Sequence, residues 1–195
     1  MVSWMIRANP KTSWNDLESM PTIAKTAYVD PAATVIGDVR IGERVYVAPG
    51  ASVRADEATP IIIGDDCNVQ DGAVFHGLEG TSIRLRKRVS IAHGAVIHGP
   101  LEIGDESFVG FNAVVHASTL GKRCFVGHLA LVVGVRLRDG SFVPPGAVVD
   151  AQEKADGLGP VPEGLRGFND EVVGVNTEFA QVYNMMDKSC KTPPI

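Results

Sequence analysis

Residues 89–116 read VSIAHGAVIHGPLEIGDESFVGFNAVVH, and a large apolar residue returns at every sixth position of this stretch. These residues are Ile91, Ile97, Ile103, Val109 and Val115. A small residue follows four positions after most of them, as Ala95 follows Ile91. A period of six fits neither an amphipathic helix nor an alternating strand, whereas one large and one small residue in each six is the signature of a parallel β-helix.

The same period continues on both sides of this stretch. Upstream the large residues are Val29, Val35, Ile41, Val47 and Val53, and after a break the series resumes at Ile63, Val69 and Phe75. Downstream, after one-residue deletions, they are Leu120, Val126, Val132, Leu137, Val143 and Val149. Three sixes close one coil, so residues eighteen apart lie one above the other at the strand spacing of about 4.8 Å. Stacked coils bury a continuous core that no single repeat could bury alone.

These observations predict an all-β chain with three parts. An N-terminal arm (1–27) precedes a parallel β-helix of hexapeptide repeats (28–150), and a linker with a C-terminal α-helix follows (151–195). The pattern resembles that of hexapeptide-repeat proteins, which implies left-handed coils. Asn169 or Asp170 is expected to cap the helix, which should pack back on the coil of its own subunit or of a neighbour. Its apolar residues at helical spacing are Val172, Val175, Phe179, Val182, Tyr183 and Met186.

Composition favours a compact protein that binds no nucleic acid and crosses no membrane. A chain of 195 residues with 45% hydrophobic residues suits one domain, and the net charge of −5 argues against a nucleic-acid partner. The first residues hold no apolar segment of signal-peptide length and no stretch is long enough to cross a bilayer, so we expect a cytoplasmic protein. Cys67, Cys124 and Cys190 show no metal-ligand spacing and are expected to be buried thiols.

The histidines can be placed on the repeat. His76 and His98 each follow an interior residue directly, so alternation along a strand turns both side chains outward. They lie twenty-two residues apart, but four residues around 79–82 interrupt the repeat. Subtracting these four leaves one coil of eighteen. His76 and His98 should therefore stack on one face, where both can reach one ion at Zn–N distances of about 2.0 to 2.1 Å.

His93 belongs to the preceding six, and hence to another face or its corner. If three histidines bind one metal ion, the third comes from a neighbouring subunit, which predicts a homotrimer with a site at each interface. His116 falls eighteen residues after His98, so either His116 is a bystander or the metal lies one coil lower. His128 is interpreted as a surface or contact residue.

Several segments resemble the γ-class carbonic anhydrases, in order and with compatible spacing. The segments are Val53-Arg54-Ala55-Asp56-Glu57, residues 64–72 (GDDCNVQDG), His76-Gly77-Leu78-Glu79, residues 93–99 (HGAVIHG), Asn9-Pro10 with Trp14-Asn15, and Val172-Val173-Gly174-Val175-Asn176. The resemblance covers nearly the whole chain. The repeat alone is shared with many acyltransferases, whereas the three histidines with Arg-x-Asp-Glu and Asn-x-Gln-Asp are more specific.

The resemblance implies a homotrimer that hydrates CO2 reversibly to bicarbonate. Its metal would be Zn²⁺, or Fe²⁺ or Co²⁺, held by His76 and His98 of one chain and His93 of the next. The resemblance also implies roles for residues around the metal: Glu57 beside the metal-bound water, Glu79 as an outer proton shuttle, Gln70 and Asn176 as orienting residues, Arg54 and Asp56 as an interface pair, and Asn68 and Trp14 as outer members.

Two departures from the archaeal enzymes of that family stand out, and two other functions stay open. The loop after Glu79 is shorter here, and Gly174 replaces an aromatic residue two positions before Asn176. A coenzyme A-dependent acyltransferase or thioesterase would use one histidine as a base and would leave the other two unexplained. A catalytically quiet, metal-binding scaffold trimer would keep the same ligands.

Overall fold

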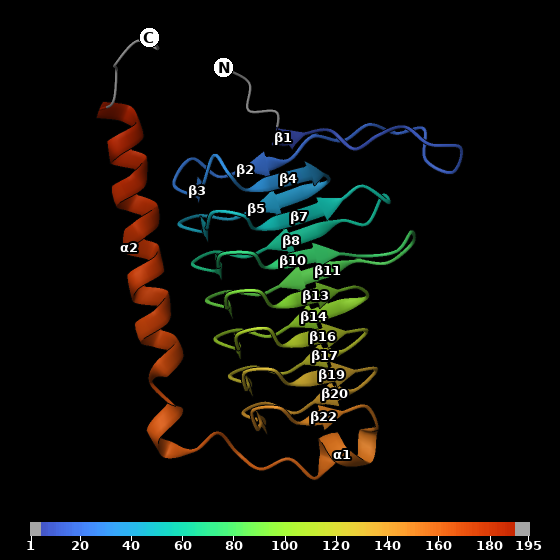
Figure 1. The fold of residues 1–195 in the computed structure, drawn as a ribbon, viewed down its shortest axis with the longest axis vertical. Coiled ribbons are helices and arrows are strands. Elements are labelled where there is room, and N and C mark those ends of the chain that lie inside the picture. The colour runs from blue at the N-terminus through green and yellow to red at the C-terminus, as the bar shows by residue number, and fades with distance from the viewer. Residues whose placement is uncertain (1–4, 190–195) are drawn as a thin grey trace.

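The computed structural model describes residues 5–189 and contains a stack of coils with one long helix beside it (Figure 1). Each coil contributes one strand to each of three parallel sheets. Sheet A contains β1 (Ile6–Arg7), β4 (Thr34–Gly37), β7 (Ser52–Ala55), β10 (Val74–His76), β13 (Val96–His98), β16 (Val114–His116), β19 (Leu131–Val133) and β22 (Val148–Val149). Sheet B contains β2 (Thr22–Ile23), β5 (Val39–Ile41), β8 (Ile61–Ile63), β11 (Ile83–Leu85), β14 (Leu101–Ile103), β17 (Thr119–Leu120) and β20 (Arg136–Leu137). Sheet C contains β3 (Tyr28–Val29), β6 (Tyr46–Val47), β9 (Asn68–Val69), β12 (Ser90–Ile91), β15 (Phe108–Val109), β18 (Phe125–Val126) and β21 (Phe142–Val143).

The interior of the coils is the apolar column that the repeat predicts. Phe75 pairs with Ile97, which pairs with Val115, and all three side chains are fully buried. The small residues of the repeat, such as Ala73 and Ala95, fill the interior at the corners between sheets C and A. The predicted fold class, a parallel β-helix of hexapeptide repeats with a helix packed on it, is confirmed.

Short elements pack on the first and last coils. β1 and β2 pair with β4 and β5, so the segment expected to form an N-terminal arm also contributes two strands. Ile23 lies six residues before Val29, which is the repeat signal that extends into this segment. At the other end, α1 (Gln152–Asp156) covers the last coil and buries Ala155 (Figure 1). The 3₁₀ turn η1 (Glu163–Leu165) leads to the long helix.

The long helix α2 (Phe168–Ser189) lies along sheet C of its own chain (Figure 1). The Tyr183 ring stacks on Tyr28 at 4.9 Å, and the Phe168 ring meets Phe108 edge-on at 5.1 Å. The residues of α2 that are buried against the coil lie three or four positions apart: Asn169, Val173, Asn176 and Ala180. Several of the apolar residues expected on the packed side are instead about half exposed, namely Val175, Phe179, Val182 and Met186.

The predicted helix cap is wrong. α2 begins at Phe168, and the backbone N–H groups of residues 170 and 171 donate to the Gly167 carbonyl. The Asn169 side chain instead donates to the Arg88 carbonyl of the coil, and Asp170 pairs with the Arg88 guanidinium at 2.6 Å. Both polar side chains thus attach the helix to the coil, because the coil offers a partner at that position.

Within residues 5–189, no helix is long and apolar enough to span a membrane. Cys67 and Cys124 are buried free thiols, as expected. Burial raises the pKa of the Cys67 thiol to about 12 and that of the Cys124 thiol to about 11. Cys190 lies outside the described residues.

Candidate metal centre

A column of polar side chains runs down the outer face of sheet A. Strand register places Arg54, His76, His98 and His116 one above another at the ends of successive strands. The His76 and His98 ring centroids lie 5.6 Å apart, and those of His98 and His116 lie 5.0 Å apart. The four-residue correction for residues 79–82 therefore gives the register correctly, and both neighbouring histidine pairs are close enough to share a ligand.

Two carboxylates distinguish the upper pair from the lower one. His76 Nε2 lies 3.1 Å from Asp56 Oδ1 and 3.5 Å from Glu57 Oε1. Arg54 Nε donates to Asp56 Oδ2 at 2.9 Å, so the three side chains form one connected group within a single chain. Because a carboxylate only accepts hydrogen bonds, His76 Nε2 carries a proton here. A cation at this nitrogen would replace that proton.

His98 is held in one tautomer by the backbone. Its Nδ1 lies 3.1 Å from the carbonyl oxygen of Gly99. The carbonyl can only accept, so Nδ1 carries the proton and Nε2 of the neutral ring keeps a lone pair. Metal-binding histidines commonly donate their other nitrogen in this way.

The loops that carry Asp56, Glu57 and Glu79 project from the side of the coil opposite α2 (Figure 1). Thr59, which sequence reasoning missed, joins these loops because its buried hydroxyl lies 3.1 Å from the Gly77 carbonyl and 2.6 Å from the Leu78 carbonyl. The only signal in the sequence is a threonine next to a proline in a segment that interrupts the repeat.

His93 lies on the corner between sheets C and A, one corner away from the ends of the sheet A strands that carry His76 and His98. Its Nδ1 lies 2.9 Å from Asp71 Oδ2, so the carboxylate holds the Nδ1 proton and leaves Nε2 as the lone pair. Backbone bonds join the corner turns one above another, in the order Asp71, His93, Phe111 and His128. Phe111 stacks on His128 at 4.3 Å and lies 5.3 Å from His93.

A cavity of about 540 Å³ opens beside His93. Gln70, Asn176, Phe111 and Val175 line it together with residues of sheet C and α2. Aromatic and aliphatic side chains form much of its wall, and Gln70, Asp71, His93, Glu171 and Asn176 place hydrogen-bonding groups around it. This combination suits a small apolar molecule that must be oriented.

The two amides of this cavity are held by neighbouring groups. Asn68 Nδ2 donates to Ser90 Oγ at 2.8 Å, and Gln70 Nε2 donates to Asn68 Oδ1 at 2.9 Å. Asn176 Nδ2 donates to the Val172 carbonyl of its own helix at 2.8 Å. The side chains of Gln70 and Asn176 are thus each held in place by an N–H that donates a hydrogen bond, and their side-chain carbonyl oxygens can accept one from a bound molecule.

The predicted site residues therefore form two groups on one chain. Arg54, Asp56, Glu57, His76 and His98 lie together on sheet A, whereas Gln70, His93 and Asn176, with Asn68 behind them, lie at the corner next to α2. Glu79 is exposed on its loop, and Trp14 is exposed on the loop between β1 and β2. Within residues 5–189, no ion pair or ring contact connects either residue with the histidines.

The donor set suits a zinc ion only if two chains contribute to it. Among the described residues of one chain, no three His, Cys, Asp or Glu side chains converge in a way that could hold a metal ion. Three neutral imidazoles are a known catalytic zinc set, and two of the three rings here already carry their proton on the nitrogen that points away from a ligand position. The three imidazoles are suitable zinc ligands, but within one chain they do not lie close enough together to bind the same ion.

Comparison with known proteins shows the family to which the chain belongs. A family model described as the hexapeptide repeat of succinyl-transferase matches residues 118–151. The carbonic anhydrase of Methanosarcina thermophila is 40% identical over 91% of this chain and 81% of its own. The carboxysome assembly protein CcmM of Nostoc is 39% identical over 95% of this chain and 36% of its own, and the mitochondrial γ carbonic anhydrase 2 of Arabidopsis thaliana is 32% identical over 89% and 59%. The chain belongs to the γ-class carbonic anhydrase family.

Proposed function

We propose that this protein hydrates CO2 reversibly to bicarbonate at zinc sites between the subunits of a homotrimer. His76 and His98 of one chain and His93 of the next would hold each ion. The proposal rests on where the three histidines lie in one chain. His76 and His98 are in register on sheet A, next to the carboxylates of Asp56 and Glu57, whereas His93 lies on a corner beside the cavity.

Two apolar surfaces support self-association. On the outer face of sheet A, a column of apolar side chains runs next to the histidines: Val74, Val96, Val114, Leu131 and Val148. On α2, Phe179 and Val182 are each 44% exposed, and Val175 and Met186 are exposed beside them. Contiguous exposed apolar side chains commonly mark interfaces, and a neighbouring copy of the chain would cover both surfaces.

The metal and the chain would divide the chemistry between them. A Zn²⁺ ion held by three neutral imidazoles lowers the pKa of a coordinated water to about 7 and so supplies hydroxide near neutral pH. The apolar wall of the cavity, with Phe111 and Val175, would admit CO2, and the carbonyl oxygens of Gln70 and Asn176 would orient the reacting groups. Asp71 would keep His93 in the tautomer that binds the metal.

A proton must leave the site in each hydration cycle. Glu57 would accept it, because this carboxylate already lies 3.5 Å from His76 Nε2. Glu79, exposed on a neighbouring loop, would pass the proton to solvent. Arg54 would hold Asp56 in place, either within the chain as seen here or across the interface.

A quiet scaffold trimer is the second candidate, since one relative is named a carboxysome assembly protein. A scaffold would bind the metal without hydrating CO2. An acyltransferase is a third candidate because the matched family model is named for succinyl-transferase, but this model covers only residues 118–151 and none of the three proposed ligands.

The test is to measure metal and activity together. The protein is purified with zinc, and in parallel with iron without oxygen, and metal per chain is compared with stopped-flow CO2 hydration. We expect about one metal per chain and rapid hydration, and we expect His93→Ala to lose both. His128→Ala, two turns along the same corner column, is the matched control and should keep both. Metal without hydration would favour the scaffold, and acetyl transfer from coenzyme A without metal would favour the acyltransferase.

A further inference from the structure

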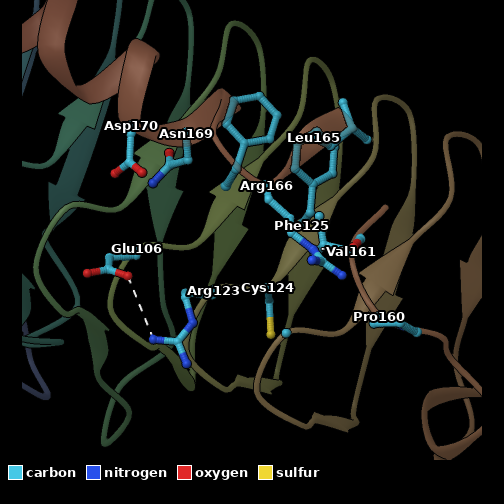
Figure 2. Close-up of a pocket in the computed structure, with 12 residues that line it drawn as sticks. Glu106, Arg123, Cys124, Phe125, Pro160, Val161, Leu165, Arg166, Asn169 and Asp170 are labelled. Carbon is cyan, nitrogen blue, oxygen red and sulfur yellow. Dashed lines mark hydrogen bonds and ion pairs between the residues drawn. The ribbon is translucent and has the colours of Figure 1, made fainter. Parts of the chain in front are cut away.

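A second cavity, of about 250 Å³, lies between the start of α2 and the part of sheet C next to the corners with sheet B (Figure 2). It shares only Phe108 with the cavity beside His93. Phe125, Val161 and Leu165 give it apolar walls, and Asn169 with two arginines supplies polar groups. Its volume is several times the roughly 30 Å³ that one water molecule occupies in the liquid.

Asn169 presents an unpaired acceptor at this cavity. Its side chain is 7% exposed, and Nδ2 donates to the Arg88 carbonyl at 2.9 Å. This bond fixes the amide orientation, because a carbonyl can only accept. Oδ1 is therefore the acceptor, and it is buried with no hydrogen-bond partner within residues 5–189. Buried acceptors in native proteins are nearly always paired, so a donor from outside the chain is expected here.

Among the charged side chains at this cavity, Arg166 has no ion-pair partner in the part of the chain that the structure describes. Asp170 is paired with Arg88 at 2.6 Å, and Arg123 lies 3.8 Å from Glu106. The Arg166 guanidinium donates to the Val161 carbonyl through Nε at 3.4 Å, and no carboxylate of the described residues lies within ion-pair distance of it. Arg166, Phe125 and Asn169 all line the cavity, and Figure 2 shows Asn169 to the left of Arg166 in this view. A planar guanidinium in this position suits a carboxylate.

We propose that this cavity binds a small amphipathic acid with an apolar or aromatic body and a hydroxyl or N–H donor. The acid group would pair with Arg166, the body would lie against Phe125, and the donor would satisfy Asn169 Oδ1. None of these residues belongs to the proposed metal site, so the inference does not depend on the proposed reaction.

The test uses 4-hydroxyphenylacetate on the full-length protein, followed by isothermal titration calorimetry. Phenylacetate lacks the hydroxyl donor, and tyramine lacks the acid. We expect 4-hydroxyphenylacetate to bind saturably and each analogue to bind about tenfold more weakly, as expected for the loss of one strong hydrogen bond. Equal binding of all three probes, or no saturable binding of 4-hydroxyphenylacetate, would overturn the proposal.

Variants locate the binding site. Arg166→Gln should weaken 4-hydroxyphenylacetate by about tenfold and leave tyramine unchanged, because tyramine offers no acid. Arg138→Gln removes an arginine that contacts the Asp156 carbonyl outside the cavity, and should change nothing. Asn169→Leu should abolish the preference for the hydroxylated probe, and circular dichroism checks that this variant folds. If it does not fold, the Arg166→Gln result decides, since unchanged affinity in that variant contradicts the proposal.

Discussion

Thr59 shows how a single buried hydroxyl positions a histidine. The hydroxyl is fully buried and bonds the carbonyls of Gly77 and Leu78, the two residues that follow His76. A methyl group on Gly77 would lie 2.7 Å from Thr59 Cγ2, so the loops approach too closely for a larger residue. His76 is therefore fixed both by the strand before it and by this contact after it.

Removing this hydroxyl should destabilise the protein without changing its shape. Thr59→Val keeps the volume, but it removes the hydroxyl that donates to the Gly77 carbonyl and one of the donors to the Leu78 carbonyl. This change is expected to lower the free energy of unfolding by about 1 to 3 kcal/mol. Urea unfolding followed by circular dichroism measures it. Thr81→Val is the matched control, because half-buried Thr81 also donates to the Leu78 carbonyl, through an exposed hydrogen bond. This change should cost less than about 0.5 kcal/mol. Equal losses in both variants would contradict the role assigned to Thr59.

The sequence predicts residue positions well where burial alone determines them. Ile97 and its neighbours follow the period, and His98 is placed by its position next to Ile97. Thr59 and Asn169 escape prediction because each acts through a hydrogen bond to a carbonyl of a distant segment. Such partners depend on how loops and helix meet, and no local pattern encodes that.

At the scale of the elements, the corner turns explain which histidine pair would bind metal. His93 lies in one turn, and Phe111 occupies the equivalent place one coil lower. In the proposed trimer, a corner that presents His93 to His76 and His98 would present Phe111 to His98 and His116. A phenyl ring offers no lone pair, so His116 has no third ligand and remains a bystander.

The metal site should therefore be movable by one coil. His76→Ala alone should lose the metal, whereas His76→Ala combined with Phe111→His should bind about one metal per chain again, through residues 98, 111 and 116. Metal content after dialysis is the measurement, and Phe111→Ala in the His76→Ala background is the control. Failure of the double variant to bind metal, in a folded trimer, would contradict the corner assignment.

The helix α2 shows the limit of periodicity at this scale. Helical spacing predicts its existence, but the side packed on the coil carries Asn169, Val173, Asn176 and Ala180 instead of the largest apolar residues. The spacing of apolar residues does not show which of two adjacent faces of the helix packs on its own chain and which packs on a neighbouring chain. In the proposed trimer, a neighbour would cover the half-exposed Phe179 and Val182.

At the scale of the whole molecule, aspartates on the corners between sheets B and C connect successive coils. Asp65 accepts the Glu43 N–H and Asp105 accepts the Lys87 N–H, each at 3.0 Å. These backbone hydrogen bonds, followed by nearby lysines, hold the pKa of both carboxyls below the usual value. The folded pKa is thus below that of the unfolded chain, about 3.9, so both carboxylates stabilise the fold above about pH 4.

This stabilisation should disappear in acid as the pH falls through the lowered folded pKa values. We expect Asp105→Asn to lower the urea midpoint at about pH 7 and to cause a smaller loss at about pH 3, because wild type takes up the same proton as the pH falls through the lowered folded pKa. Asp16→Asn, on an exposed loop, should have no effect at either pH. A loss for Asp105→Asn that is the same at both pH values would show that its charge is unimportant.

The central claim for the whole molecule is that one metal site requires two chains. The most direct test mixes His76→Ala chains with His93→Ala chains in equal amounts, refolds them together and measures bound metal in the purified trimers. Each variant alone should bind none, because every interface lacks a ligand. In random trimers about one quarter of interfaces pair an intact sheet A with an intact corner, so about one quarter of the wild-type metal should return. Mixed trimers that bind no more metal than either variant alone would contradict the account.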